Sequence, residues 1–143
     1  MSALGATTKS GLGDPALAEP VVIRASQINH CAFCLDMHLA LARGHGVPRR
    51  QLDPPAACEE AEGVFDERER AALALTEEVT VLTGRTSHAF GSWGGFVPDA
   101  VYEQAAEYVD DIRLAHLVGL IVAINNRNRV MAARRVPPGG HIP

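Results

Sequence analysis

Apolar residues recur along this chain at the three- and four-residue spacing of α-helices. The clearest case is 65–82, which carries one apolar stripe. Asp66 lies near the start of this segment and Glu69 follows three residues later, which is the spacing of a capping box. The pattern therefore predicts a helix that begins just after Asp66. The stripe consists of Ala72, Leu75, Val79 and Leu82.

Two helices are predicted ahead of this one. Val21–Ile28 contains β-branched residues that are common in strands, but the chain offers no strand partner. We therefore assign a helix, with Pro20 at its first position. Asn29 is expected to cap a second helix over 31–43, and Gly44 is expected to end it.

Two more helices are predicted toward the C-terminal end. One covers 98–108 and begins at a proline. The last is capped by Asp110 or Asp111 and runs to about Arg134. Its middle, 114–124, is apolar nearly all round, which is typical of a helix in a core or a subunit interface. The chain is therefore expected to be all-α, with about five or six helices.

Length and composition indicate one domain. The chain has 143 residues, enough to bury a sizeable core. We expect the domain to cover 17–134. The small, polar and glycine-containing segment 1–16 is expected to be mobile, and 135–143, with its prolines and glycines, is expected to be a frayed tail.

Charge and hydropathy argue against several classes of partner. The net charge is −4 and no long basic run occurs, so no nucleic-acid partner is expected. The longest apolar run, 114–124, is too short to cross a bilayer, so no membrane partner is expected either. The first residues lack the pattern of a secretory signal. We therefore expect a cytoplasmic protein, in which stable structural disulfides are uncommon.

Cys31, Cys34 and His38 carry the candidate chemistry, in the pattern C-x-x-C-x-x-x-H. On one helix they would lie within about 60° of one another, so both thiols and the imidazole would share a face. Backbone N–H groups at the helix start favour a thiolate, and the two thiols could close a disulfide. This arrangement favours a redox centre.

Two other interpretations of the same residues stay open. Zinc could be bound by the two cysteines and His38, with His30, His45 or Cys58 as a fourth ligand, although no second ligand pair follows in the sequence. Alternatively, the cysteines could be buried apolar residues beside an unrelated histidine.

A wider motif is more specific. Glu19 precedes the cysteines in the pattern E-x11-C-x-x-C-x-x-x-H, and SQIN lies just before the pair. With FDERERAALALTEEVT, VPDAVYE and INNRNR further on, the chain resembles the carboxymuconolactone decarboxylase superfamily, in its alkylhydroperoxidase D-like (AhpD-like) branch. The resemblance covers about 17–131. It implies an all-α, AhpD-like domain that assembles as a homo-oligomer, commonly a trimer or hexamer.

The resemblance also implies a reaction. Cys34 matches the peroxidatic cysteine, which attacks a hydroperoxide and becomes a sulfenic acid. Cys31 matches the cysteine that donates a proton and then closes the disulfide. His38 and Glu19 match the proton relay. No metal or flavin is implied, only the redox-active disulfide, and a dithiol protein or a small thiol would reduce it again.

Two alternatives to a peroxidase remain. One is a lactone-acid enzyme of the carboxymuconolactone decarboxylase type, which would not need the paired thiols. The other is a non-catalytic, redox-sensing or oligomeric scaffold. Turnover separates the scaffold from the peroxidase, because a sensor stops after one disulfide per chain.

Three features depart from the family pattern. Pro20 follows Glu19, and a residue before proline is biased away from the α region, so Glu19 is expected at a helix edge. Only a glycine-containing segment precedes Glu19, so one wall of the site is expected to be missing or supplied by a neighbouring subunit. The loop Gly84–Gly95 looks like an insertion, whose aromatic residues either anchor it or fold over a pocket.

Overall fold

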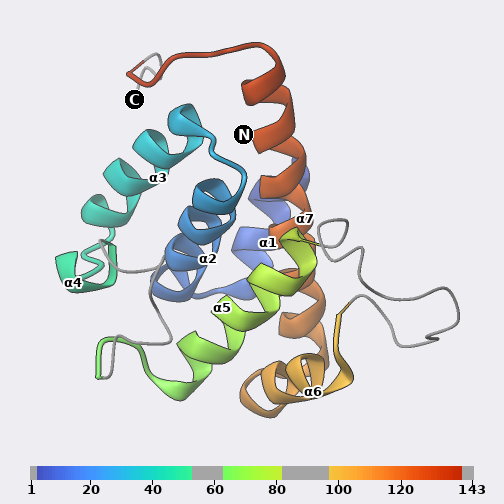
Figure 1. The fold of residues 1–143 in the computed structure, drawn as a ribbon. Coiled ribbons are helices and arrows are strands. Elements are labelled where there is room, and N and C mark those ends of the chain that lie inside the picture. Colours follow the sequence, from blue (N-terminus) through green and yellow to red (C-terminus); the bar gives the residue numbers. More distant parts are fainter. Residues whose placement is uncertain (1–2, 53–62, 82–96, 140–143) are drawn as a thin grey trace, which may run out of the picture.

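The computed structural model describes residues 3–52, 63–81 and 97–139, and within these ranges it contains helices and no strands (Figure 1). The all-α prediction is confirmed. The helices are α1 (Ala3–Leu12), α2 (Pro15–Ile28), α3 (Ala32–Gly44), α4 (Arg49–Leu52), α5 (Glu67–Thr80), α6 (Asp99–Tyr108) and α7 (Asp111–Ala133).

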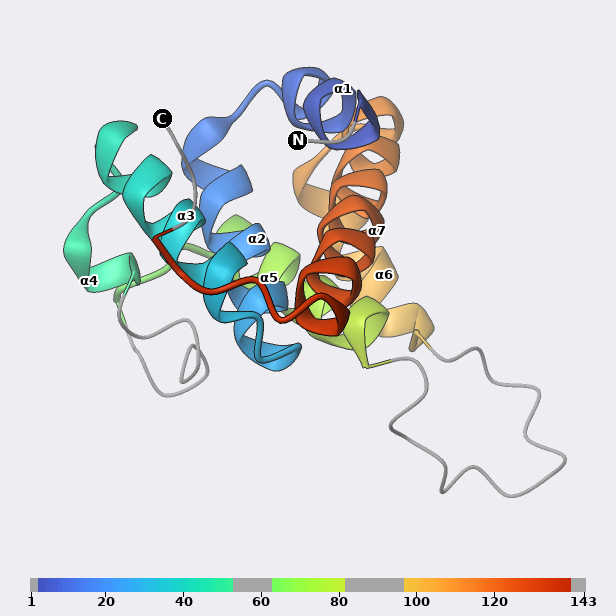
Figure 2. The same cartoon turned by 90° about the horizontal axis from the view of Figure 1, so that it is seen from above.

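Helix α2 occupies the centre of the fold. It packs against α3 on one side and against α5 and α7 on the other (Figure 1). Helix α1 packs mainly on α7, and Figure 2 shows the two helices together on the side of α2 away from α3 and α4. Side chains of α2 and α3 therefore face a wall that α1 and α7 build together.

The predicted starts of α5 and α7 are confirmed. The Asp66 carboxylate accepts the Glu69 N–H at 2.7 Å, and the Glu69 carboxylate accepts the Asp66 N–H at 2.9 Å, which completes the capping box. At the start of α7, the Asp110 carboxylate accepts the Arg113 N–H at 2.8 Å. In both cases the side chain satisfies a backbone donor that the helix itself leaves unpaired.

Helix α7 lies partly in the core. Its outer side leaves Ile112, Val122 and Val130 exposed by 72%, 47% and 43%. The apolar residues of this helix thus form a buried stripe in the core and, on the outer side, an exposed apolar surface. The core stripe includes Leu114, Leu117, Leu120, Ile121 and Ile124.

Residues 3–12, expected to be mobile, form α1 instead. Small residues allow α1 to approach α7 closely. A Cβ atom added to Gly119 would lie 2.7 Å from Thr8 Cγ2, and one added to Gly11 would overlap the His116 ring. Gly11, one of the glycines on which the expectation of mobility rested, is thus a point of close approach between α1 and α7.

Helix α2 begins at Pro15 rather than at the predicted Pro20. Asp14 caps it by accepting the Leu17 N–H at 3.1 Å, and Pro15 takes the first helical position. Pro20 lies inside the helix, where the missing N–H costs one backbone hydrogen bond. Glu19 is consequently held within the helix and is 0% exposed, not placed at a helix edge as expected.

A short turn, 29–31, joins α2 to α3. Cys31 is the N-cap of α3, whereas the predicted cap, Asn29, ends α2. His30 adopts a left-handed φ of 53°, which reverses the chain. The Cys31 N–H then bonds the Ser26 carbonyl at 3.0 Å. Gly44 ends α3 as predicted.

Some predicted features lie outside the described residues, namely Cys58 and the Gly84–Gly95 loop with its aromatic residues. The predicted frayed tail, 135–143, is described as far as Gly139. The Gly139 N–H donates to Asp36 Oδ2 on α3 at 2.9 Å, so this part of the tail lies against α3.

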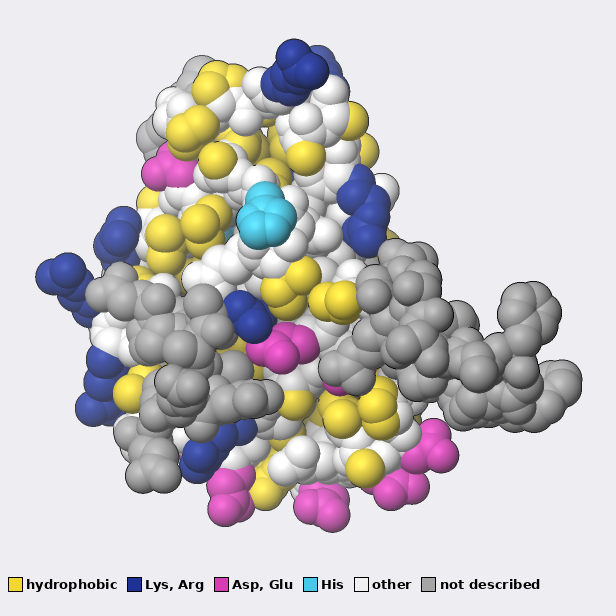
Figure 3. Space-filling view, in the orientation of Figure 1, with side chains coloured by type: hydrophobic (Ala, Val, Ile, Leu, Met, Phe, Trp, Pro, Cys, Tyr) yellow, Lys and Arg dark blue, Asp and Glu magenta, His cyan; other side chains and the backbone are white. Residues whose placement is uncertain are grey.

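Figure 3 shows several acidic side chains at the end of the molecule formed by α6 and several basic side chains on the side of α4, with further charged groups of both signs elsewhere on this face. No helix in the described ranges has the length and hydropathy to cross a bilayer.

Candidate active site

Glu19 of α2 and His38 of α3 meet inside the fold. Glu19 is 0% exposed and His38 is 3% exposed. His38 Nδ1 lies 3.2 Å from Glu19 Oε2. An ionised carboxylate only accepts hydrogen bonds, so with Glu19 ionised the Nδ1–H of His38 donates and Nε2 is left as an acceptor. The contact between these two residues forms although Pro20 follows Glu19 within α2.

Lys9 of α1 contacts the same carboxylate. Its Nζ forms an ion pair with Glu19 Oε1, and His45 Nε2 lies 3.8 Å from that oxygen. Burial alone would raise the pKa of Glu19, but the hydrogen bonds from His38 and Lys9 outweigh it, and the pKa is lowered. Glu19 is therefore ionised at neutral pH. The wall that was expected to be missing is supplied by α1 of the same chain.

Cys31 and Cys34 share the first turn of α3. Cys31 Sγ accepts the Cys34 N–H at 3.4 Å, in the manner of an N-cap side chain. The two residues are 3% and 0% exposed, and no disulfide joins them in this structure. His38 follows Cys34 by four residues, one helical turn further along the same face. Cys34 and His38 therefore lie on one side of α3, where His38 contacts Glu19.

The Cys34 thiol is held in its neutral form. Burial, and after it the hydrogen bond with Cys31, raises the pKa of Cys34 to about 12. Asn128 and Arg127 act in the opposite direction but do not offset this. Nucleophilic attack by Cys34 at neutral pH therefore requires a base that takes its proton.

An asparagine network on α7 was not recognised in the sequence as part of the site. Asn128 is 0% exposed, donates to Ser26 Oγ at 3.1 Å and accepts from Asn29 at 3.1 Å. Asn29 also donates to Asn125 at 2.8 Å. Asn128 hydrogen-bonds Cys34, which favours the thiolate. The sequence feature that could have revealed this network is the spacing of Asn125 and Asn128, two polar residues three positions apart in the apolar pattern of α7.

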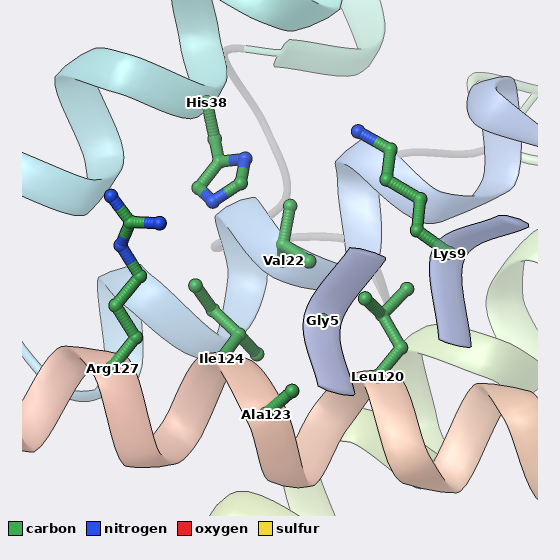
Figure 4. Close-up of a pocket in the computed structure, with 8 residues that line it drawn as sticks. All are labelled: Gly5, Lys9, Val22, His38, Leu120, Ala123, Ile124 and Arg127. Carbon is green, nitrogen blue, oxygen red and sulfur yellow. The ribbon is translucent and has the colours of Figure 1, made fainter. Parts of the chain in front are cut away.

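A narrow pocket lies between α1, α3 and α7, beside His38 (Figure 4). Its volume of about 20 Å³ suits one water-sized group. Three of its lining side chains are basic: Lys9, His38 and Arg127. Neither cysteine is among the residues that line the pocket. The other lining residues are Gly5, Val22, Leu120, Ala123 and Ile124.

The described residues contain no group of three His, Cys, Asp or Glu side chains placed to hold a metal ion. Two of the proposed fourth ligands for zinc have other surroundings. His30 forms the turn between α2 and α3, and His45 faces Glu19. The third, Cys58, lies outside the described ranges. The zinc interpretation therefore finds no ligand set in this part of the chain.

Comparison with known proteins agrees with this picture. The family model of the carboxymuconolactone decarboxylase family matches residues 1–78, more than half of the 143-residue chain. The matched region includes Glu19, both cysteines and His38. It also includes α1, the helix that was not predicted.

Two individual proteins are similar to this chain. The uncharacterized protein YdfG of Bacillus subtilis (strain 168) is 34% identical over 115 residues, which cover 80% of this chain and 71% of YdfG. A crystal structure from Agrobacterium tumefaciens has a TM-score of 0.83 and 27% identity, and covers 97% of this chain and 88% of that chain. That protein is of unknown function, with a suggested role as the antioxidant defence protein AhpD.

Proposed function

This chain belongs to the carboxymuconolactone decarboxylase family, and we propose that it is a thiol-dependent peroxidase. The observation that carries the proposal is the buried Glu19–His38 pair beside a C-x-x-C pair at a helix start. A buried base whose orientation is fixed by a carboxylate is the arrangement that activates a neutral nucleophile. Because the pKa of Cys34 is raised, its thiol needs such a base to remove the proton before it can attack.

The first step is oxidation of Cys34. His38 Nε2 takes the thiol proton, and Glu19 stabilises the imidazolium that forms. The thiolate attacks the outer oxygen of a hydroperoxide, the O–O bond breaks, and the imidazolium returns the proton to the departing alkoxide. The products are an alcohol and a Cys34 sulfenic acid.

The second step closes a disulfide. The Cys31 sulfur attacks the sulfenic sulfur of Cys34 and water leaves, with the Cys31 proton going to the departing hydroxide. The N-cap position of Cys31 suits this role, because it places the Cys31 sulfur 3.4 Å from the backbone nitrogen of Cys34. Two thiols of an external reductant then restore the dithiol and are themselves joined in a disulfide.

Variants in which one cysteine at a time is replaced by serine test these roles of Cys34 and Cys31. Cys34→Ser should abolish hydroperoxide consumption with dithiothreitol as reductant. Cys31→Ser should retain one attack and accumulate a sulfenic acid, seen as a mass gain of about 16 Da. The matched control is Cys58→Ser, which removes the remaining cysteine outside the motif and should keep full turnover. Equal activity in all three variants would refute the mechanism.

The same assay separates the other functions open to this family. A lactone-acid enzyme would show no dependence on Cys31 and Cys34, and a redox sensor would form one disulfide without sustained turnover. We also propose that the chain forms a homo-oligomer through the apolar outer side of α7, which carries Ile112, Val122 and Val130. Light scattering on the native protein and on Val122→Glu checks this, with dissociation expected in the variant.

A further inference from the structure

Arg127 of α7 is a cation without a counter-ion in the described part of the chain. It lines the pocket beside His38, and its side chain rises from α7 toward α3 (Figure 4). None of the ion pairs between described residues includes it. Its Nε is buried and has no hydrogen-bond partner. A buried donor on a charged group costs free energy when it has no hydrogen-bond partner. A bound anion that accepts from this donor would remove the cost.

The contacts that Arg127 makes neither neutralise its charge nor pair its Nε. Its guanidinium carbon lies 5.7 Å from the centre of the Phe33 ring, and one terminal nitrogen donates to Met37 Sδ at 3.4 Å. Stacking on an aromatic ring holds the guanidinium plane but uses none of its N–H groups. A thioether is a weak acceptor and carries no charge. Arg127 is thus oriented by α3 without being neutralised.

The charges around the pocket do not balance. The ammonium of Lys9 is neutralised by Glu19, which also holds His38. Arg127 therefore adds one unpaired positive charge to a wall that, apart from Lys9 and His38, is formed by apolar residues such as Val22 and Ile124. A neutral or cationic ligand would leave this charge uncompensated, whereas an anion would pair with it through two parallel N–H bonds.

We propose that this pocket binds the carboxylate of a small, anionic alkyl hydroperoxide, with Arg127 as the residue that recognises the charge. This assignment of a substrate class rests on the peroxidase function proposed above. Arg127 lines the pocket together with His38, the proposed base, so a carboxylate paired with Arg127 would hold the peroxide on the side of His38. The volume of about 20 Å³ limits what enters beside Arg127 to a small group such as the carboxylate, and the apolar wall favours an aliphatic chain next to it.

Binding is tested without catalysis, using butyrate and its neutral analogue butyramide on the reduced native protein, followed by NMR titration. Butyrate should bind saturably and butyramide should not. Arg127→Met should weaken butyrate binding at least about tenfold. Arg127→Lys keeps the positive charge but cannot donate two parallel N–H bonds to a carboxylate. Its affinity for butyrate should therefore lie between those of the native protein and Arg127→Met. The control is Arg113→Met, an exposed arginine on the same helix, which should bind as the native protein does.

Catalysis is tested with a matched pair of substrates, tert-butyl hydroperoxide and 3-hydroperoxy-3-methylbutanoate, which adds a carboxylate. The native protein should have the lower KM for the anionic substrate, and Arg127→Met should remove that preference. Equal binding of butyrate and butyramide by the native protein would overturn the proposal. Unchanged butyrate binding in Arg127→Met, with slower Cys34 alkylation, would overturn it too and assign Arg127 to the thiolate.

The two proposals fail separately in these experiments. Selective butyrate binding with no consumption of either hydroperoxide would refute the peroxidase, and with it the substrate class, while leaving a carboxylate site at Arg127. Consumption of both hydroperoxides with equal KM would refute the carboxylate site and leave the peroxidase in place.

Discussion

The Lys9 ammonium forms an ion pair with one oxygen of Glu19, while the other oxygen accepts the N–H of His38. One buried carboxylate thereby joins three helices, α1, α2 and α3. The ion pair keeps Glu19 charged, and the charged carboxylate fixes which nitrogen of His38 carries the proton. The N-terminal helix therefore contacts the proposed proton relay as well as the core.

Removal of the Lys9 charge should weaken both the fold and the relay. In Lys9→Met the effect of burial on Glu19 is opposed mainly by the hydrogen bond from His38, so the pKa of Glu19 should rise. We expect the free energy of unfolding to fall by about 1–3 kcal/mol in urea titrations at pH 7, less than for a fully buried pair because Lys9 is 17% exposed. Lys9→Arg should recover most of the loss. A Lys9→Met protein as stable as the native one would contradict the role assigned to this pair.

Neutralisation of Glu19 should slow the reaction more than it disturbs the fold. In Glu19→Gln the amide can no longer stabilise a His38 imidazolium, so kcat/KM for an alkyl hydroperoxide should fall by about 10²–10⁴-fold. The control is Glu103→Gln, an exposed glutamate on α6. Rates within twofold of each other in the two variants would remove Glu19 from the relay.

The raised pKa of Cys34 predicts slow alkylation at neutral pH. The rate of iodoacetamide labelling at Cys34, followed by peptide mass spectrometry, should climb about tenfold per pH unit and continue to climb above pH 9. Urea-unfolded protein provides the reference, with an inflection near the ordinary thiol pKa. His38→Ala should shift the native profile to still higher pH. A native inflection below pH 8 would show that Cys34 is not held as a neutral thiol.

The lowered pKa of Glu19 predicts acid sensitivity with a defined sign. Because the pKa is lower in the folded than in the unfolded chain, Glu19 stabilises the fold above its unfolded pKa of about 4.5, and this contribution is lost as the pH falls through the folded pKa. The unfolding free energy of Glu19→Gln should therefore change less than that of the native protein between pH 5 and pH 3. Parallel pH profiles for the two proteins would contradict this.

Helices with strong local signals could be predicted from the sequence. The start of α5 follows from the reciprocal side-chain bonds of Asp66 and Glu69, which depend only on residues three positions apart. The Glu19–His38 pair followed from the resemblance and not from local pattern, since Pro20 argued against it. That argument failed because the rest of α2 is held by packing on three neighbouring helices, which outweighs the bias of one residue.

The parts that could not be predicted depend on contacts between distant residues. Helix α1 has weak local signals, and its stability comes from close packing of Thr8 against Gly119, more than a hundred positions away. Lys9 enters the site only because that packing holds it there. Arg127 and Asn128 likewise reach Cys34 from the far end of the chain, which only the tertiary fold brings near.

The central claim is that Cys31 and Cys34 form a recyclable redox pair next to the Glu19–His38 relay. The most direct measurement is the intact mass of the reduced protein after one equivalent of an alkyl hydroperoxide, followed by repeated cycles with dithiothreitol. The account predicts a rapid loss of about 2 Da that maps to a Cys31–Cys34 disulfide and is regained and lost again in every cycle. An unchanged mass in the native protein would contradict it.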